Sequence, residues 1–357
     1  MMKKLFLVSL FMLSMIMMLA ACGSSSSSNS APESTESENE SSTPQETTNE
    51  QTVDEVTFDI SLSLGEGSFA DVGVQKFKEE LEALSGGAMS LNLHYNNTFG
   101  GEREVIEMMG INSLDMATTS SGALGTWSKE FNMFDLPFLF RDHEHAYQVF
   151  DSEIGEELAT NFEQSSNVKI LSFWTAGYRY LSSAEGPIKH VDDVAGMKHR
   201  VQENEVQIDT WRAYGGNPTP MAWPEVYTGL QQGVIESQSN PLDSIYTMKF
   251  FEVQDYVSKL PEIYQPYLLL MSETLFDSLT PEQQAIVLEA ADNSVQHARE
   301  GFEKLDAEAT EILKEKGMEI TETEDIDVES FKEKVEPVYE RFAPEFGEEL
   351  INSIRNS

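Results

Sequence analysis

The stretch from Gly196 to Pro241 constrains the fold more than any other part of the chain. It opens with an alternating segment in which Lys198, Arg200 and Gln202 share one face, which is typical of a strand. It closes with a second alternating segment, Val234 to Asn240. Both segments place polar side chains toward their ends, where the strands of α/β proteins bind ligands.

Two short helical patterns lie between these segments. The first includes Trp211 and ends before Gly215, and the second begins at Pro224 and ends before Gly233. Proline in a first turn and glycine after a last turn are typical of helix ends. The whole stretch therefore predicts the order strand, helix, helix, strand.

Residues 1–22 form a targeting segment. Lys3 and Lys4 precede an apolar run from Leu5 to Leu19, which is short for a span of about 30 Å of hydrocarbon. The run ends before Cys22, the only cysteine of the chain. We expect a lipoprotein signal peptide with lipid on Cys22; the alternative is an ordinary signal peptide with an incidental cysteine.

Residues 23–55 are rich in Ser, Thr, Asn and Glu and predict a disordered acidic tether, because they offer too little apolar surface to offset chain entropy. The chain has 23 Lys and Arg against 62 Asp and Glu, a net charge of −39. This balance argues against nucleic acid as a partner. An anionic ligand would need local positive charge, which makes the few arginines informative.

The folded part begins with a strand, helix and strand pattern. Val56 to Leu64 alternates, Asp71 to Leu84 is an amphipathic helix, and Met89 to Tyr95 is a second strand. This order predicts a parallel sheet of the α/β class. About 300 residues follow the tether, enough for two lobes with a cleft.

Several motifs occur in a fixed order along the chain: GINSLDMATTSSGAL (110–124), FDLPFLFRDHEHA (134–146), GMKHRVQ (196–202), MAWPEVY (221–227) and ESQSNP (236–241). In this order they resemble the solute-binding proteins of TRAP (tripartite ATP-independent periplasmic) transporters, of the dicarboxylate-binding type. The chain departs from the family at Glu236-Ser237, where members have Asp-Gly. The resemblance extends over most of residues 57–310.

This resemblance implies an α/β, two-lobed periplasmic-binding-protein-like fold with a central cleft, hinge strands and a long helix spanning both lobes. The chain would cross between lobes at Ala176-Gly177 and again between Glu262 and Leu268. Lobe I would comprise residues 56–176 and about 266–303. Lobe II would comprise residues 177–265 and about 304–357.

The long helix begins at an N-cap, Thr280, with Pro281 in its first turn, and ends at Gly317. About 36 residues at 1.5 Å each give roughly 54 Å, more than one lobe. Its apolar residues step by threes and fours: Leu288, Ala291, Val295, Ala298, Phe302, Leu305, Ala309 and Ile312. The alternative to a spanning helix is a coiled-coil dimer seam. Residues 318–357 predict a short strand and a helical tail.

The resemblance assigns the ligand carboxylate to Arg200, whose planar guanidinium suits paired hydrogen bonds to a carboxylate. Arg179 is a second candidate, Trp223 would pack over the ligand, and Asn240 would bond it. For the arginines the alternative is a structural or surface ion pair. Trp223 could instead be a core residue, and an Asn before Pro241 could be a turn residue.

Gln238, like Asn240, could bond a carboxylate oxygen or a hydroxyl group of the ligand. Further candidates that could bond ligand hydroxyl groups are Gln202, Asn204, Glu66, Glu102, Ser120 and Ser121. Trp174 and Tyr178 are expected to pack. No nucleophile motif, P-loop, HExxH or CxxC occurs. His143 and His145 match a structural motif of the family, so we expect no metal, no cofactor and no enzyme activity.

The function that the resemblance implies is that of an extracytoplasmic binding protein on the outer face of the cell membrane. It would capture a small organic anion and deliver it to small and large permease subunits. The segment 203–223 is similar to members that bind sugar acids such as uronates or aldonates. A C4-dicarboxylate, held by Arg179 and Arg200 at opposite ends, is the alternative. A secreted hydrolase and a surface sensory protein are the rivals from other classes.

Overall fold

The computed structural model describes residues 54–356 and contains a five-stranded sheet of order β2-β1-β3-β12-β4. Its strands are β1 (Val56–Leu62), β2 (Met89–His94), β3 (Met116–Ser120), β4 (Val168–Phe173) and β12 (Tyr267–Ser272). Strand β1 is parallel to β2 and β3, and β12 is antiparallel to β3 and β4. The predicted parallel start of the sheet is therefore confirmed.

Both faces of this sheet are covered, and β12 shows why its sequence is apolar throughout. Leu268 and Leu270 face one core cluster, whereas Leu269 and Met271 face another. A strand buried on both faces needs apolar residues at successive positions. The surrounding helices are α1 (Phe69–Leu84), α2 (Glu102–Gly110), η1 (Ser121–Thr126), η2 (Lys129–Asp135), α3 (His143–Phe150), α4 (Glu153–Ser166) and α8 (Glu273–Ser278).

A second sheet has six strands in the order β13-β10-β6-β9-β7-β8. Its strands are β6 (Tyr180–Ser183), β7 (Lys198–Val201), β8 (Asn217–Pro220), β9 (Ser237–Asn240), β10 (Tyr256–Ser258) and β13 (Glu319–Thr321). The helices around it are η3 (Val191–Val194), α5 (Glu205–Ala213), η4 (Trp223–Glu225), α6 (Val226–Gln231), α7 (Leu242–Thr247), η5 (Phe250–Glu252) and η6 (Thr323–Asp325).

Strand β8 corrects the predicted order strand, helix, helix, strand, because it lies between the two helices. It pairs in parallel with β7 at the edge of the sheet. Pro218 and Pro220 concealed it in the sequence, since proline cannot donate to a strand ladder. An edge strand tolerates proline because its outer side needs no partner.

Two short strands connect the sheets, β5 (Gly177–Tyr178) and β11 (Tyr264–Gln265), which pair antiparallel with each other. Through them the chain passes from β4 to β6 and returns from β10 to β12. These passages coincide with the two crossings expected from the sequence. The lobe boundaries themselves stay a prediction.

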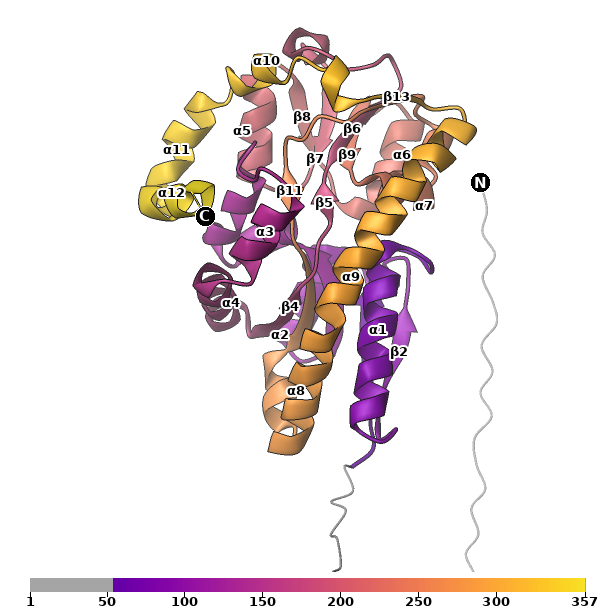
Figure 1. Ribbon diagram of the computed structural model, residues 1–357, viewed down its shortest axis with the longest axis vertical. Coiled ribbons are helices and arrows are strands. Elements are labelled where there is room, and N and C mark those ends of the chain that lie inside the picture. The colour runs from indigo at the N-terminus through magenta and orange to yellow at the C-terminus, as the bar shows by residue number, and fades with distance from the viewer. Residues whose placement is uncertain (1–53, 357) are drawn as a thin grey trace, which may run out of the picture. The chain divides into compact units, whose positions relative to one another are not determined.

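Helix α9 (Pro281–Glu315) begins at Thr280 with a capping box completed by Gln283. It packs along α1 and then along α7, so it contacts the helices of both sheets (Figure 1). Its first part joins the cluster of β1 and α1, and its last part joins the cluster of α6 and β10. This matches the helix expected to span both lobes, with its apolar face buried within the chain.

The predicted apolar face of α9 was wrong at two positions. Leu288 is 43% exposed, and Val287 is buried in its place. Leu313, and not Ile312, is fully buried near the end of the helix. Val287 packs in the cluster of β1 and α1, and Leu313 packs in the cluster of α6 and β10, so the buried face follows these tertiary contacts.

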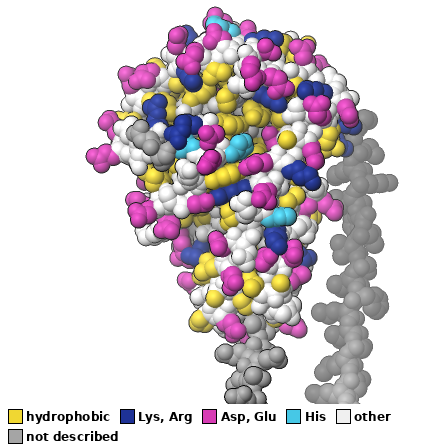
Figure 2. Space-filling view, viewed as in Figure 1, with side chains coloured by type: hydrophobic (Ala, Val, Ile, Leu, Met, Phe, Trp, Pro, Cys, Tyr) yellow, Lys and Arg dark blue, Asp and Glu magenta, His cyan; other side chains and the backbone are white. Residues whose placement is uncertain are grey.

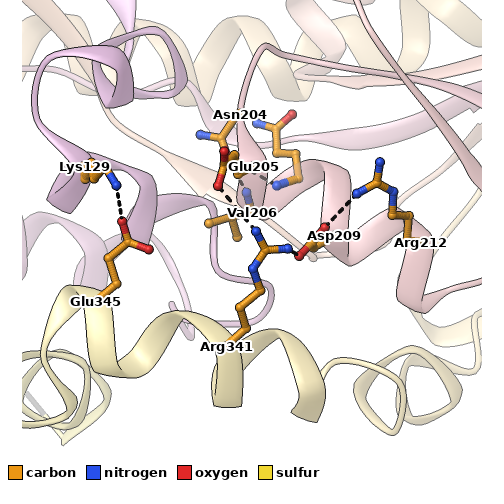
Figure 3. A network of polar contacts seen from close by, with 9 residues as sticks. Lys129, Asn204, Glu205, Val206, Asp209, Arg212, Arg341 and Glu345 are labelled. Carbon is orange, nitrogen blue, oxygen red and sulfur yellow. Dashed lines mark hydrogen bonds and ion pairs between the residues drawn. The ribbon is translucent and has the colours of Figure 1, made fainter.

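The tail forms α10 (Val328–Lys332), α11 (Glu336–Phe346) and α12 (Glu348–Asn356), after the predicted short strand β13. Helix α11 lies against both η2 and α5. Glu345 accepts a hydrogen bond from Lys129 on η2, and Arg341 pairs with Asp209 and Glu205 on α5 (Figure 3). One helix therefore binds elements next to both sheets.

Acidic side chains are spread over the face shown in Figure 2. Within residues 54–356 no helix is long and apolar enough to cross a bilayer. The predicted signal peptide, the lipid site at Cys22 and nearly all of the tether lie outside the described residues.

Gly177, at the first passage between the sheets, tests this arrangement. Its φ is +61°, and a Cβ there would overlap the ring of Phe302 on α9. We expect Gly177→Ala to lower the free energy of unfolding by about 2–4 kcal/mol, from backbone strain plus overpacking. Urea unfolding measures this. Gly186→Ala, with nothing within 4 Å of its Cβ, is the control, and equal effects of the two would contradict the account.

Candidate functional site

A cavity lies where strands of both sheets end, and its empty space, with the solvent at its mouth included, is about 390 Å³. Ser120 ends β3, Asn240 ends β9, Arg200 is near the end of β7, and Tyr267 begins the antiparallel β12 at the same edge. The complete lining is Ser63, Leu64, Phe69, Glu102, Ser120, Ala176, Arg179, Arg200, Gln202, Trp223, Asn240, Pro241, Ser244 and Tyr267. Residues from distant parts of the sequence thus form one cavity, lined by both polar and apolar side chains.

Arg200 is 4% exposed and is held at one edge of its guanidinium. Nε and Nη2 both donate to the backbone oxygen of Met221, at 3.0 and 2.9 Å. Its third nitrogen, Nη1, has no hydrogen-bond partner among residues 54–356. Burial, with a smaller effect of the neighbouring Arg179, lowers the pKa of Arg200 to about 9, so the group remains cationic at neutral pH.

Arg179 lies in the same cavity and is also 4% exposed. Nη1 donates to Oε1 of Gln265 at 3.0 Å, Nη2 donates to the backbone oxygen of Ser239, and the buried Nε has no partner in the described chain. Burial lowers the pKa of Arg179 to about 10, against the opposing effect of nearby carboxylates such as Asp135. Two desolvated cations therefore face one small space.

Glu102 supplies the opposite charge on the wall. Its Oε1 accepts from the backbone N–H of Ser120 at 2.8 Å, and its Oε2 accepts from Oγ of Ser120 at 2.9 Å. Oγ of Ser120 in turn accepts from Nε2 of Gln202 at 2.9 Å. Burial raises the pKa of Glu102, while the serine bonds and the arginines act in the opposite direction.

Trp223 and Asn240 complete the predicted set in the lining. The guanidinium of Arg200 lies 5.8 Å from the centre of the Trp223 ring, within the range of a cation–π contact. Nδ2 of Asn240 donates to Oε1 of Gln238. Gln238 is fully buried behind the wall, where its Nε2 donates to Ser182 at 2.5 Å.

Four other sequence candidates lie away from this cavity. Glu66 is exposed, and Ser121 is buried outside the lining. Asn204 caps α5 and bonds Asn132 and Asp135. Gln238 is the fourth candidate, and it contacts the lining only through its hydrogen bond with Asn240. None of the four residues lines the cavity itself.

Sequence reasoning missed part of the lining. Ser63 and Leu64 line the cavity and lie at the end of the first predicted strand. Their position at a strand end could have identified both from the sequence. Tyr267 lies in the second predicted crossing and its hydroxyl is 2.8 Å from Oγ of Ser63. For Phe69 and Ser244, at the starts of α1 and α7, the sequence carries no comparable signal.

A second cavity adjoins the first, and its empty space, with the solvent at its mouth included, is about 460 Å³. The two share Glu102, Arg200, Gln202 and Trp223, and the second adds exposed charged side chains such as Arg103.

The two histidines of the HEHA segment make hydrogen bonds within the chain. Nδ1 of His143 is 2.9 Å from the hydroxyl of Tyr264, and Nε2 of His145 is 2.6 Å from the backbone oxygen of Ile354. Across residues 54–356 there is no group of three or more His, Cys, Asp or Glu that could hold a metal ion.

Comparison with known proteins gives a family model that matches residues 60–345, described as bacterial extracellular solute-binding protein, family 7. Among solved structures, a TRAP periplasmic solute binding protein from Polaromonas sp JS666, bound to D-erythronate, is 34% identical. It superposes with a TM-score of 0.81 over 84% of this chain and 98% of that one.

Two further structures are similar. One, from Bordetella bronchispeptica with density attributed to pantoate, is 36% identical, has a TM-score of 0.81, and covers 84% of this chain and 99% of its own. The other, from Sulfitobacter sp. NAS-14.1 with bound β-D-galacturonate, is 31% identical, has a TM-score of 0.80, and covers 85% of this chain and all of its own.

Buried Glu262, close to Arg179, predicts how stability depends on pH. Burial raises its pKa from 4.5 to about 7, so the folded protein holds a proton that the unfolded chain releases. The carboxyl therefore costs stability above pH 7, and this cost is removed as the pH falls from 7 toward 4.5. We expect Glu262→Gln to remove roughly 1 kcal/mol of the stability that the protein gains between pH 8 and pH 6.

Urea unfolding at both pH values measures this gain. The exposed Glu185→Gln variant is the control and should gain as much stability as the unaltered protein. An unchanged gain in Glu262→Gln would show that Glu262 is not the group that titrates.

Proposed function

The chain belongs to the bacterial extracellular solute-binding proteins of family 7, and on this premise we propose that its cavity binds a sugar acid through Arg200 and Arg179. Proteins of this TRAP class bind small organic acids outside the cytoplasm and work with membrane permease subunits. The chain is accordingly the solute-binding component of such a transporter.

The observation that carries the proposal is the pair of buried guanidiniums in one cavity. Removing a cation from water is costly unless an opposite charge pairs with it. Nη1 of Arg200 and Nε of Arg179 have no partner in residues 54–356, and both arginines line the cavity. A carboxylate in the cavity would accept from Nη1 of Arg200 and would offset the mutual repulsion of the two cations.

Glu102 favours a sugar acid over a C4-dicarboxylate. A carboxylate only accepts hydrogen bonds, so Glu102 would attract ligand hydroxyls and repel a second ligand carboxylate. Ser63, Ser120 and Tyr267 add hydroxyl groups that both donate and accept. The bound D-erythronate and β-D-galacturonate of the similar structures combine one carboxylate with hydroxyl groups in the same way.

The anchor belongs to this proposal as well. Cys22 follows an apolar segment and precedes an acidic, polar stretch that reaches to the first strand. Lipid on Cys22 would hold the protein at the outer face of the membrane, close to the permease subunits. The stretch between Cys22 and Val56 would serve as a tether of sufficient length for the ligand-binding part to reach them.

A thermal-shift screen tests the ligand class. We expect sugar acids such as D-erythronate, D-galactonate and D-galacturonate to raise Tm, because a ligand that binds only the folded state stabilises it. Succinate, malate and fumarate should leave Tm nearly unchanged, because one end would meet Glu102. The reverse pattern would establish the dicarboxylate alternative, and chemical change of a bound sugar acid would favour the hydrolase.

Arg200→Ala tests the clamp. We expect it to weaken binding of the sugar acid found in the screen by about 2–5 kcal/mol, because the carboxylate loses its buried partner. Arg200→Lys should recover only part of the affinity, since an ammonium lacks the planar fork. Isothermal titration measures both. Arg212→Ala removes an exposed arginine and serves as control; equal affinities of both alanine variants would refute the assignment.

A further inference from the structure

A fully buried carboxylate, Asp135, lies at the end of η2 and outside the cavity lining. Its Oδ1 accepts from Nε2 of Gln207 at 2.8 Å and from Nε2 of Gln265, and its Oδ2 accepts from Nδ2 of Asn204 at 2.8 Å. Three side-chain amides thus direct their NH2 groups to one carboxylate.

This arrangement determines which way each amide is turned. Because Gln207 donates to Asp135, its Oε1 is free to accept from the backbone N–H of Gln202 at 2.9 Å. Nε2 of Gln207 and Nε2 of Gln265 also donate to Oε1 of Gln202, at 2.8 and 3.0 Å. The amide oxygen of Gln202 therefore faces the network, and its NH2 group is left to donate to Ser120.

Two arms lead from Asp135 to the ligand site. In the first, Gln202 donates to Oγ of Ser120, which donates to Glu102. In the second, Gln265 donates to Asp135 with its NH2 group, so that its Oε1 accepts from Arg179. Reversing either glutamine amide would place like groups against each other.

The network also connects the two sheets. Ser120 ends β3 of the five-stranded sheet and Asp135 ends η2 beside it, whereas Gln207 is on α5 and Gln202 follows β7 of the six-stranded sheet. Helix α11 binds η2 and α5 from outside through its charged side chains (Figure 3). The elements that carry Asp135 and Gln207, η2 and α5, are therefore also joined through α11.

We propose that Asp135 is a positioning residue for ligand binding, which orients the amides of Gln202 and Gln265 and thereby the groups that Ser120, Glu102 and Arg179 present to the ligand. This role rests on the proposed function. A carboxylate suits it because both of its oxygens only accept hydrogen bonds.

Asparagine has the same shape but cannot replace Asp135 here. An NH2 group in place of Oδ1 would face the NH2 groups of Gln207 and Gln265. An NH2 group in place of Oδ2 would face the NH2 group of Asn204. Asn204 cannot turn its amide to relieve this, because its oxygen accepts from the backbone N–H groups at the start of α5. Every orientation leaves at least one buried donor opposed to another donor, which is costly.

A double-mutant cycle of Asp135→Asn with Gln202→Met tests the proposal on two observables: the free energy of unfolding without ligand, and the Kd for D-galacturonate and D-erythronate. We expect Asp135→Asn to raise Kd about 10- to 100-fold in the unaltered protein. In the Gln202→Met background the rise should be at least threefold smaller, because one arm is already absent. Asp115→Asn is the control: that carboxylate bonds the backbone N–H of Asp59, away from the cavity.

Equal effects of Asp135→Asn on Kd in the unaltered protein and in the Gln202→Met and Gln265→Met backgrounds, which each lack one arm, would overturn the positioning role. That result would stand even with coupling in unfolding, because a purely structural residue would behave in that way. If the effects of the two substitutions on the free energy of unfolding simply add, the hydrogen-bond network itself is wrong. If the unaltered protein binds neither acid nor any other sugar acid, the proposed function fails and this role fails with it. If Asp135→Asn does not fold, Gln207→Met, which leaves Asp135 bonded to Gln265 and Asn204, replaces it in the cycle.

Discussion

Two guanidiniums without full pairing, buried in a strongly acidic protein, are the constraint on which the rest of the structure depends. Arg200 and Arg179 are each 4% exposed and line one cavity, although burial opposes the charge of both. The fold offsets this cost with carbonyl oxygens, an amide oxygen and the carboxylate of Glu102. The part that remains unpaired is what we propose an anionic ligand pairs with, and the overall charge of −39 makes such positive sites rare.

The surrounding polar contacts hold these cations in place and join the two sheets. On one side Asp135 receives three amide donors from α5, its N-cap and β11. On the other side Asp243 accepts from the N–H of Phe69, at 3.1 Å, and so links α7 to the start of α1. Phe69 lines the cavity, so this contact also bears on the site. Both carboxylates are buried, which makes their hydrogen-bond geometry demanding.

Much of the fold follows from local patterns. Alternation predicted β1 and β2, and the capping signals predicted the start of α9 at Pro281. The face of α9 was wrong near Leu288 because burial there follows contact with α1, which no local period encodes. Strand β8 was missed because it contains two prolines, which are compatible with a strand only at the edge of a sheet. Whether a strand lies at an edge is decided by the assembled sheet and cannot be read from the local sequence.

By itself the sequence determined the class of the fold, the family and most polar residues of the cavity, because strand ends and ordered motifs are local. Only the tertiary structure decided that Gln238 lies behind Asn240, that Glu66 is exposed, and that Asp135 directs two glutamines toward the site. The contact between Asp135 and Gln265 joins residues 130 positions apart in the sequence. Such partners are chosen by the packing of two sheets around a cavity, and side-chain periodicity carries no information about them.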